Sequence, residues 1–344
     1  MNIKQYFKEA IEADASDLHL VGNELPMIRV EGELKELDKK QLNAKELEVV
    51  IYEELVSKDQ KIRFEEEKEL DFSYEQEGAR FRVNLHRQED VVGLSARLIP
   101  ATIPSPEDLR FEPILKEVPS MLDGLVLVTG PTGCGKSTTL AAIIEEINKN
   151  RKAHIITVED PIEFLFEDKN SLIEQREVGT DTNSFANALK HVLRQDPNVI
   201  LVGEMRDPET IATVLTAAET GHLVFSTLHT SSAAEAVERI VDVFDGAKQK
   251  QILIQLSSVL RVVVAQQLLP SKDGGRVPAR EILVNTTGVA NLIKENNINQ
   301  IKSAIQTGSK DGMVSMENSI KQLVKDDLIT DETAQKRSGR NKSV

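Results

Sequence analysis

The sequence predicts an α/β protein of two domains, and three observations carry that prediction. Its 344 residues are long for a single compact core, so two domains are the natural expectation. Apolar runs of strand length alternate with helical patterns over the later part of the chain, whereas the first part mixes the two. Five of the 12 prolines fall between residues 100 and 119. We therefore expect a first domain over residues 1–99, a linker over 100–119, a second domain over 120–335 and a flexible tail over 336–344.

The first domain is expected to be a small α+β domain. Residues 17–20, 27–30 and 80–85 alternate polar and apolar side chains with the period of a strand. Residues 93–99 have the composition of one further strand, and residues 44–56 have helical character. Both kinds of element therefore share this part of the chain.

The linker prediction depends on proline. A proline ring fixes φ and removes a backbone N–H, so a stretch that holds five of them is not expected to form a regular helix or a central strand. We expect a semi-rigid connection that serves as a hinge between the two domains.

In the second domain, strands and helices alternate. Four runs are apolar nearly throughout, as expected for parallel strands covered on both faces: 125–129, 154–158, 199–203 and 223–228. A helix is predicted over 208–219, with Asp207 as N-cap and Gly221 just past its end. Repeated units of this kind predict an open parallel sheet. From about Val243 onward the pattern is mainly helical, interrupted by a hairpin around residues 273–275.

A phosphate-binding loop joins the first of these strands to a helix. Residues 130–137 read Gly-Pro-Thr-Gly-Cys-Gly-Lys-Ser, which matches G-x-x-x-x-G-K-[ST] in its strand–loop–helix context. The glycines let backbone N–H groups face phosphate oxygens, Lys136 supplies a charge for the β- and γ-phosphates, and Ser137 offers a hydroxyl to Mg²⁺. The expected ligands are therefore ATP and Mg²⁺. The residues expected to contact them are Gly130, Pro131, Thr132, Gly133, Cys134, Gly135, Lys136, Ser137 and Thr138.

Acidic residues follow two of the predicted strands. Because ligands lie beyond the carboxyl ends of parallel strands, these ends should face the phosphate loop in one pocket. Glu204 can orient and deprotonate an attacking water or hold Mg²⁺ through water, although Gly203 stands where many phosphate-loop enzymes have a metal-binding aspartate. Glu163 is the favoured Mg²⁺ ligand of the acidic run 159–163, for which a solvated turn is the alternative.

One histidine and two arginines complete the candidate site. His229 lies at the nucleotide end of strand 223–228 and can hydrogen-bond a γ-phosphate, whereas His222 lies at the other end, where a core or capping role is expected. Arg82 and Arg97 lie on predicted strands of the first domain. They form either a solvent-exposed basic face or arginines that reach a transferring phosphate across a subunit or domain boundary.

Composition excludes several classes of function. The net charge of −14 argues against a broad nucleic-acid surface, although not against a local basic groove. The single cysteine, Cys134, excludes an internal disulfide and a multi-cysteine zinc site. No apolar stretch approaches the ~18–20 residues that span a bilayer, and the charged N-terminus does not have the pattern of a signal peptide. We therefore expect a cytoplasmic protein.

In combination, these motifs resemble those of the secretion and type IV pilus motor ATPases, and most closely the pilus retraction ATPase (PilT) family. The resemblance covers nearly the whole chain, although Val289 and Asn291 depart from the retraction-type C-terminal motif. The segments that carry it are 15–20 and 26–32 (PAS-like N-terminal domain), 159–163 (Asp box), 202–207 (atypical Walker B), 221–230 (His box) and 289–295 (retraction-type C-terminal motif).

The resemblance implies a PAS-like first domain and a RecA-like ATPase domain with C-terminal helices. It also implies a homohexamer whose ATP sites lie at subunit boundaries, with Arg82 and Arg97 acting in trans. It further implies docking to the pilus machinery through a platform protein at the cytoplasmic face of the inner membrane. ATP-driven domain motion would then power pilus retraction and twitching motility.

Three alternative functions stay open at this point. A pilus-assembly or type II secretion ATPase shares the same superfamily, but commonly carries a longer N-terminal region and a four-cysteine zinc insertion. A nucleic-acid translocase is disfavoured by the acidic charge and by an aromatic content of 4% without tryptophan. A non-hydrolysing nucleotide-gated scaffold is disfavoured by the presence of both Lys136 and Glu204.

Overall fold

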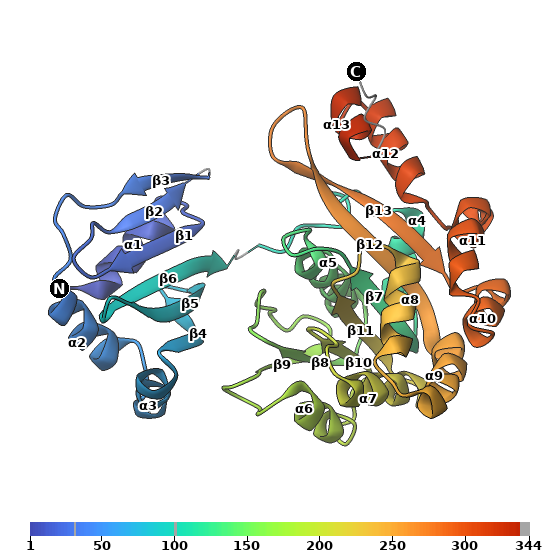
Figure 1. Ribbon diagram of the computed structural model, residues 1–344, viewed down its shortest axis with the longest axis horizontal. Helices are drawn as coiled ribbons and strands as arrows, with labels where there is room; N and C mark the ends of the chain where they lie inside the picture. The colour runs from blue at the N-terminus through green and yellow to red at the C-terminus, as the bar shows by residue number, and fades with distance from the viewer. Residues whose placement is uncertain (31, 100–101, 338–344) are drawn as a thin grey trace. The chain divides into compact units, whose positions relative to one another are not determined.

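The computed structural model describes residues 1–30, 32–99 and 102–337. Its contacts divide the chain into two compact units, Met1–Thr102 with Pro161–Leu165, and Ile103–Asp160 with Phe166–Val344. The protein is an α/β protein with an antiparallel sheet in the first unit and a mixed, mostly parallel sheet in the second (Figure 1). No helix among the described residues is long and apolar enough to cross a membrane.

The first unit is a six-stranded antiparallel sheet with helices against one face. The strand order is β3-β2-β1-β6-β5-β4. The strands are β1 Asp17–Val21, β2 Met27–Val30, β3 Glu33–Glu36, β4 Glu69–Gln76, β5 Ala79–Gln88 and β6 Val91–Ile99. The helices are α1 Ile3–Glu12, α2 Ala44–Glu54 and α3 Lys58–Glu67. All four predicted strands and the predicted helix are confirmed, whereas β3, β4, α1 and α3 were not predicted.

Alternation along these strands separates a buried face from a polar one. Leu18 and Ala96 are opposite each other on β1 and β6, and both are buried in the core that the helices cover. Their neighbours Asp17 and Arg97 are also opposite each other, and Arg97 in turn faces Arg82 on β5. Since side chains alternate along a strand, this polar row lies on the opposite face of the sheet.

The second unit is a seven-stranded sheet in the order β13-β12-β7-β11-β10-β8-β9. Every neighbouring pair is parallel except β12 with β13. The strands are β7 Gly124–Thr129, β8 His154–Glu159, β9 Leu172–Glu177, β10 Val199–Val202, β11 Leu223–Leu228, β12 Leu260–Pro270 and β13 Arg276–Val284. The four predicted parallel strands are confirmed.

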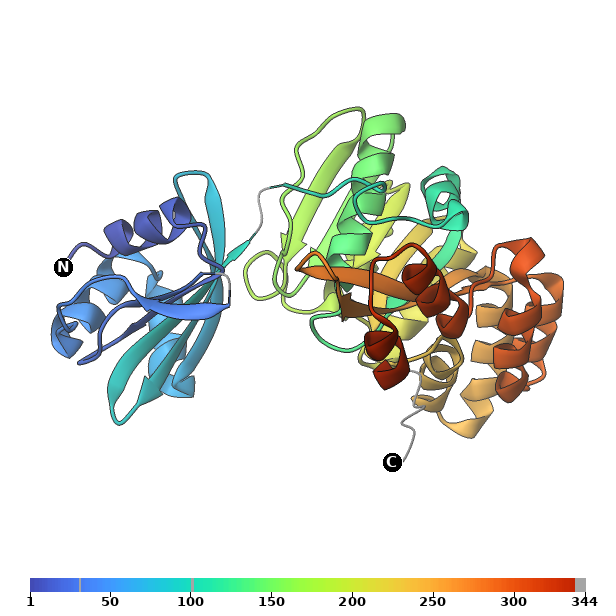
Figure 2. The same cartoon turned by 90° about the horizontal axis from the view of Figure 1, so that it is seen from above.

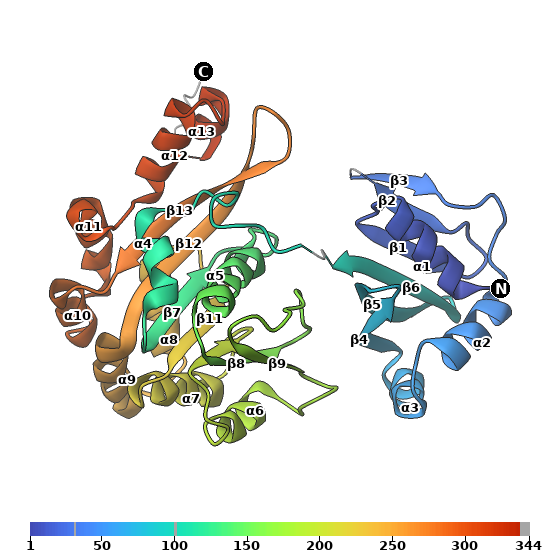
Figure 3. The ribbon, with the colours of Figure 1, turned by 180° about the vertical axis from the view of Figure 1, so that it is seen from behind.

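Helices cover both faces of the second sheet, which explains why its central strands are apolar throughout. On β7, Leu125 and Leu127 pack into one core with α6–α9, whereas Val126 and Val128 pack into the other with α4 and α5. Figures 1 and 3 show these two faces, and Figure 2 shows the helical layers on opposite sides of the sheet. The helices are α4 Pro113–Glu117, α5 Lys136–Asn150, α6 Phe185–Val192, α7 Pro208–Glu219, α8 Ala233–Asp242 and α9 Gly246–Val259.

The chain after Val243 is mainly helical and is interrupted by a hairpin, as predicted. The hairpin consists of β12 and β13, which complete the sheet. The predicted turn around residues 273–275 does join these two strands, and Ser271 N–H donates to the Gly275 carbonyl there. The helices that follow are α10 Thr287–Lys294, α11 Ile301–Thr307, α12 Met316–Lys325 and α13 Asp331–Arg337.

The proline-rich stretch also contains a helix, contrary to expectation. Pro113 occupies the first position of α4, where its missing N–H costs no helical hydrogen bond, and Leu115 is buried below it. Residues 103–119 group with the second unit, while residues 100–101 of the predicted linker lie outside the described residues. The predicted flexible tail begins too early, since Lys336 belongs to α13, and residues 338–344 lie outside the described residues.

Candidate nucleotide-binding site

The loop between β7 and α5 has the backbone that a phosphate cradle needs. Gly130 has a φ of 145°, and Gly135, which precedes the first residue of α5, has a φ of 84°. Such positive φ values suit glycine and strain other residues. Because α5 begins at Lys136, the N–H groups of its first turn have no helical carbonyl partner and point toward the loop. The predicted strand–loop–helix context is therefore present.

Lys136 folds back along this loop. Its Nζ donates to the Gly130 carbonyl at 2.8 Å and to the Pro131 carbonyl at 3.3 Å, and the side chain is buried. Ser137 and Thr138 follow it in the first turn of α5 and are partly accessible. The Cys134 thiol is buried, and that burial raises its pKa, so at neutral pH it is an uncharged filler of the loop.

The acid and the histidine of the prediction meet at the same edge of the sheet. Glu204 follows β10 and His229 follows β11, and His229 Nε2 lies 3.3 Å from Glu204 Oε2. The other oxygen of Glu204 pairs with Arg206 at 2.7 Å. The strand β11 separates β10 from β7, so Glu204 stands about 10 Å across the sheet from the start of the phosphate loop.

Thr129, the last residue of β7, ties the loop to the His229 segment. Its hydroxyl donates to the Thr230 carbonyl at 2.8 Å and accepts from the Thr230 N–H at 2.9 Å. Met205 N–H donates to the Thr227 carbonyl, which joins the end of β10 to that of β11. The edge is thus held together by hydrogen bonds between neighbouring strand ends.

Other predicted residues lie outside this cluster. Glu163 belongs to the segment Pro161–Leu165, which groups with the first unit, so its Mg²⁺ role stays a prediction. Arg82 and Arg97 also belong to the first unit, where they face each other on β5 and β6, and Arg97 Nε donates to Asp17 at 2.9 Å. His222 Nδ1–H donates to the Ala217 carbonyl at 2.9 Å, at the far end of β11, which fits the expected core or capping role.

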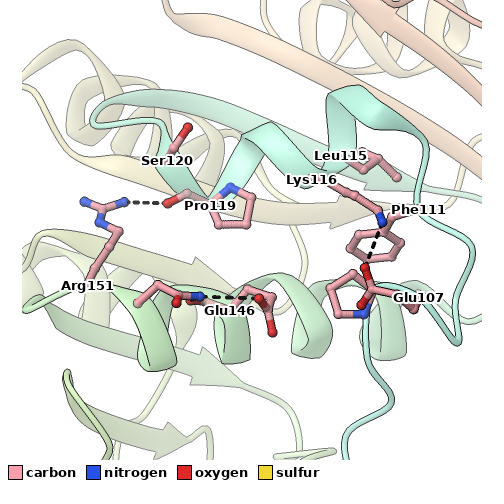
Figure 4. A pocket seen from close by; sticks show the side chains of 10 residues that line it. Glu107, Phe111, Leu115, Lys116, Pro119, Ser120, Glu146 and Arg151 are labelled. Carbon is pink, nitrogen blue, oxygen red and sulfur yellow. Dashed lines mark hydrogen bonds and ion pairs between the residues drawn. The ribbon is translucent and has the colours of Figure 1, made fainter.

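Arg206 was not predicted as a site residue. It lies in the same motif as Glu204, directly beyond β10, and the only available signal was that position. A cavity of about 370 Å³ in the second unit is not part of the site either. It lies beside Glu146 and Arg151, at the opposite end of α5 from the phosphate loop, and Figure 4 shows the residues that line it.

Comparison with known proteins identifies the family. A model of the type II/IV secretion system proteins matches residues 1–330. The chain belongs to this family. It is 46% identical over 339 residues to the type IV pilus retraction ATPase PilT of Pseudomonas aeruginosa, and the alignment covers 98% of each chain. It is 48% identical over 321 residues to a twitching motility protein of Neisseria gonorrhoeae, which covers 93% of this chain and 86% of that one.

A solved structure extends this family relationship to the fold. The crystal structure of the pilus retraction motor PilT with bound ADP is 44% identical in sequence, with a TM-score of 0.92 over 100% of this chain and 99% of that chain. The resemblance drawn from the motifs is therefore confirmed: the chain is a member of the PilT family, among the secretion and pilus motor ATPases.

Proposed function

We propose that this PilT family member is a Mg²⁺-dependent ATPase that powers type IV pilus retraction, and hence twitching motility. The observation that carries the hydrolytic activity is the phosphate loop beside the Glu204–His229 pair at one sheet edge. Retraction, rather than another motor task, is supported by near-complete length coverage with relatives that bear that name.

The residues divide the chemistry as follows. Lys136, Ser137 and the loop amides bind the phosphates of ATP, as their positions at the start of α5 suit an anion. Glu204 orients the attacking water and accepts its proton, after its carboxylate turns from Arg206 and His229. His229 then contacts the γ-phosphate. A bound Mg²⁺ would neutralise charge on the phosphates, and Ser137 and Glu163 supply the oxygen ligands that it prefers.

The assembly proposal extends the resemblance. A PAS-like domain over 1–99 and a RecA-like domain over 120–335, joined at 100–119, would form a homohexameric ring whose sites receive Arg82 and Arg97 from a neighbouring subunit. The exposure of both arginines supports this role, because each can reach a partner without leaving a core. The ring would act on a platform protein at the cytoplasmic face of the inner membrane. No nucleic-acid partner is proposed.

Glu204→Gln tests this proposal. The variant should bind ATP as the wild type does and hydrolyse it at least ~100-fold more slowly, because the amide cannot accept a proton from water. In a host whose own copy carries the change, more surface pili and lost twitching would support a retraction motor. Bald cells would instead favour the second candidate, an assembly or secretion motor, and wild-type turnover would refute the assignment of Glu204.

A further inference from the structure

A series of buried hydrogen bonds leads away from the phosphate loop on the side opposite to Glu204. It begins at the Cys134 carbonyl inside the loop and passes through Gln266 on β12 and Arg280 on β13. It ends on the carbonyls of Leu109 and Arg110 and the carboxylate of Glu112, in segment 109–112, which precedes α4. None of these contacts is needed to explain how the nucleotide is held or hydrolysed.

The side-chain amide of Gln266 contacts both the phosphate loop and the helix α5 that follows it. Its Nε2 donates to the Cys134 carbonyl at 2.7 Å, and its Oε1 accepts from the Thr139 hydroxyl at 2.9 Å. Thr139 lies in the first turns of α5, so one amide spans the loop and the start of its helix. Oε1 also accepts from Arg280 Nε at 2.8 Å, and only 3% of Gln266 is exposed. The orientation of this amide is therefore fixed by Arg280 as well as by the loop.

Arg280 is the largest side chain with under 2% exposure among the described residues. It faces Gln266 across the β12–β13 pair. Its guanidinium donates to the Leu109 carbonyl at 2.9 Å and to the Arg110 carbonyl at 3.3 Å, and pairs with Glu112 at 3.2 Å. A buried charge is costly unless its donors are satisfied, so the segment and the arginine order each other.

The other side of the segment borders the cavity of about 370 Å³. Phe111 lies under the Arg280 guanidinium, 5.3 Å from its ring centre, and also lines the 370 Å³ cavity together with Pro106 and Leu115 (Figure 4). Protein interiors are otherwise close-packed and resist movement. When the contact with Arg280 changes, the segment can therefore shift toward this cavity.

We propose that Gln266 is a positioning residue for the phosphate loop, and that Arg280 couples its orientation to the packing of segment 109–112. The inference rests on the proposed nucleotide binding and deepens it. Nucleotide on the loop fixes the Cys134 carbonyl, which fixes Gln266, and Gln266 in turn favours the arrangement of Arg280 that holds the segment. Coupling of this kind is reciprocal, so a well-packed segment also strengthens nucleotide binding.

Two substitutions separate this role from general stability. Gln266→Glu keeps the size of the side chain and the acceptors for Thr139 and Arg280, but replaces the donor to the Cys134 carbonyl with a second oxygen. Arg280→Lys keeps the buried charge but loses the fork that reaches Gln266 and the segment together. Arg261→Lys is the matched control. Arg261 is on β12, as Gln266 is, but it lies at the start of the strand, where it donates to the Ser258 carbonyl.

The readouts are ADP affinity of the full-length protein and amide hydrogen exchange of residues 109–111 with and without ADP. These amides donate to carbonyls of residues 105–107, so their exchange reports the order of the segment. In the wild type and in Arg261→Lys, ADP should slow this exchange. In Gln266→Glu and Arg280→Lys, affinity should fall about tenfold, as for the loss of a buried hydrogen bond, and the ADP-dependent slowing should disappear.

The outcomes distinguish the two proposals. If the wild type binds ADP and both variants keep its affinity within twofold, or keep the ADP-dependent slowing, the coupling is refuted while the proposed function stands. If the wild type does not bind ADP at all, the proposed function fails and the coupling fails with it. A matching loss in Arg261→Lys would assign the effect to general loosening of the sheet and would also refute the coupling.

Discussion

Replacement of Gly130 by alanine should destabilise the second unit far more than the same change at another glycine. A Cβ at this position would lie 2.3 Å from the Gln266 carbonyl oxygen and 2.6 Å from the Cys134 sulfur. The first neighbour is backbone within β12, and the second is a buried side chain, so neither can swing away. The change also places a side chain at a φ of 145°, which favours glycine.

The magnitude follows from these two costs. A strained positive φ costs about 1–3 kcal/mol, and overpacking of a well-filled interior costs about 1–3 kcal/mol more. At about 2–4 °C per kcal/mol for a domain of this size, a total near 4 kcal/mol lowers the unfolding temperature by about 8–16 °C. ADP affinity should also fall, because relief of the clash moves the loop that binds the phosphates.

Gly221→Ala is the control, and thermal unfolding followed by circular dichroism is the assay. Gly221 has a φ of 97°, but nothing lies within 4 Å of the Cβ that alanine would add there. This variant therefore carries the conformational cost alone, about 1–3 kcal/mol. Unfolding temperatures of the two variants within ~2 °C of each other would refute the steric part of the reasoning.

Two further predictions concern the loop and its tie to the His229 segment. Lys136→Ala should abolish ATP binding measured by calorimetry while the unfolding temperature changes little, since Nζ contacts only carbonyls of its own loop; retained affinity would contradict the assigned role. Thr129→Val removes the hydrogen bonds of the Thr129 hydroxyl to Thr230, which should cost about 1–3 kcal/mol and lower kcat with KM for ATP preserved. Thr129→Ser keeps the hydroxyl and should behave as the wild type; equal losses in the two variants would exclude the hydrogen bonds as the cause.

The parts of the fold that the sequence predicted are those with a local signal. The helix α7 was placed at its observed bounds, because Asp207 caps it and Gly221 follows its end. In contrast, β9 was missed, because it is an edge strand paired only with β8 and lacks a continuous apolar run. The hairpin of β12 and β13 was predicted from the turn signal at residues 273–275, but the bounds of its strands were not, because β12 follows α9 directly.

The candidate site divides in the same way. The loop, Glu204 and His229 could be predicted because each follows a recognisable parallel strand, and such strand ends meet at one edge. Gln266 could not, because its partners Cys134 and Thr139 are more than a hundred residues away and a buried glutamine has no local motif. Its position depends on the pairing of β12 with β7, for which the local sequence carries no signal.

The strand order gives the phosphate loop two different neighbours. On one side, β11 and β10 bring His229 and Glu204 to the carboxyl end of the sheet, where the two side chains meet. On the other side, β12 pairs with β7 so that Ala265 lies opposite Thr129. The next residue, Gln266, donates to the Cys134 carbonyl of the loop. On our proposals, the first side performs hydrolysis and the second transmits occupancy of the loop to segment 109–112. One phosphate loop can serve both because β7 lies inside the strand order, with β11 on one side and β12 on the other.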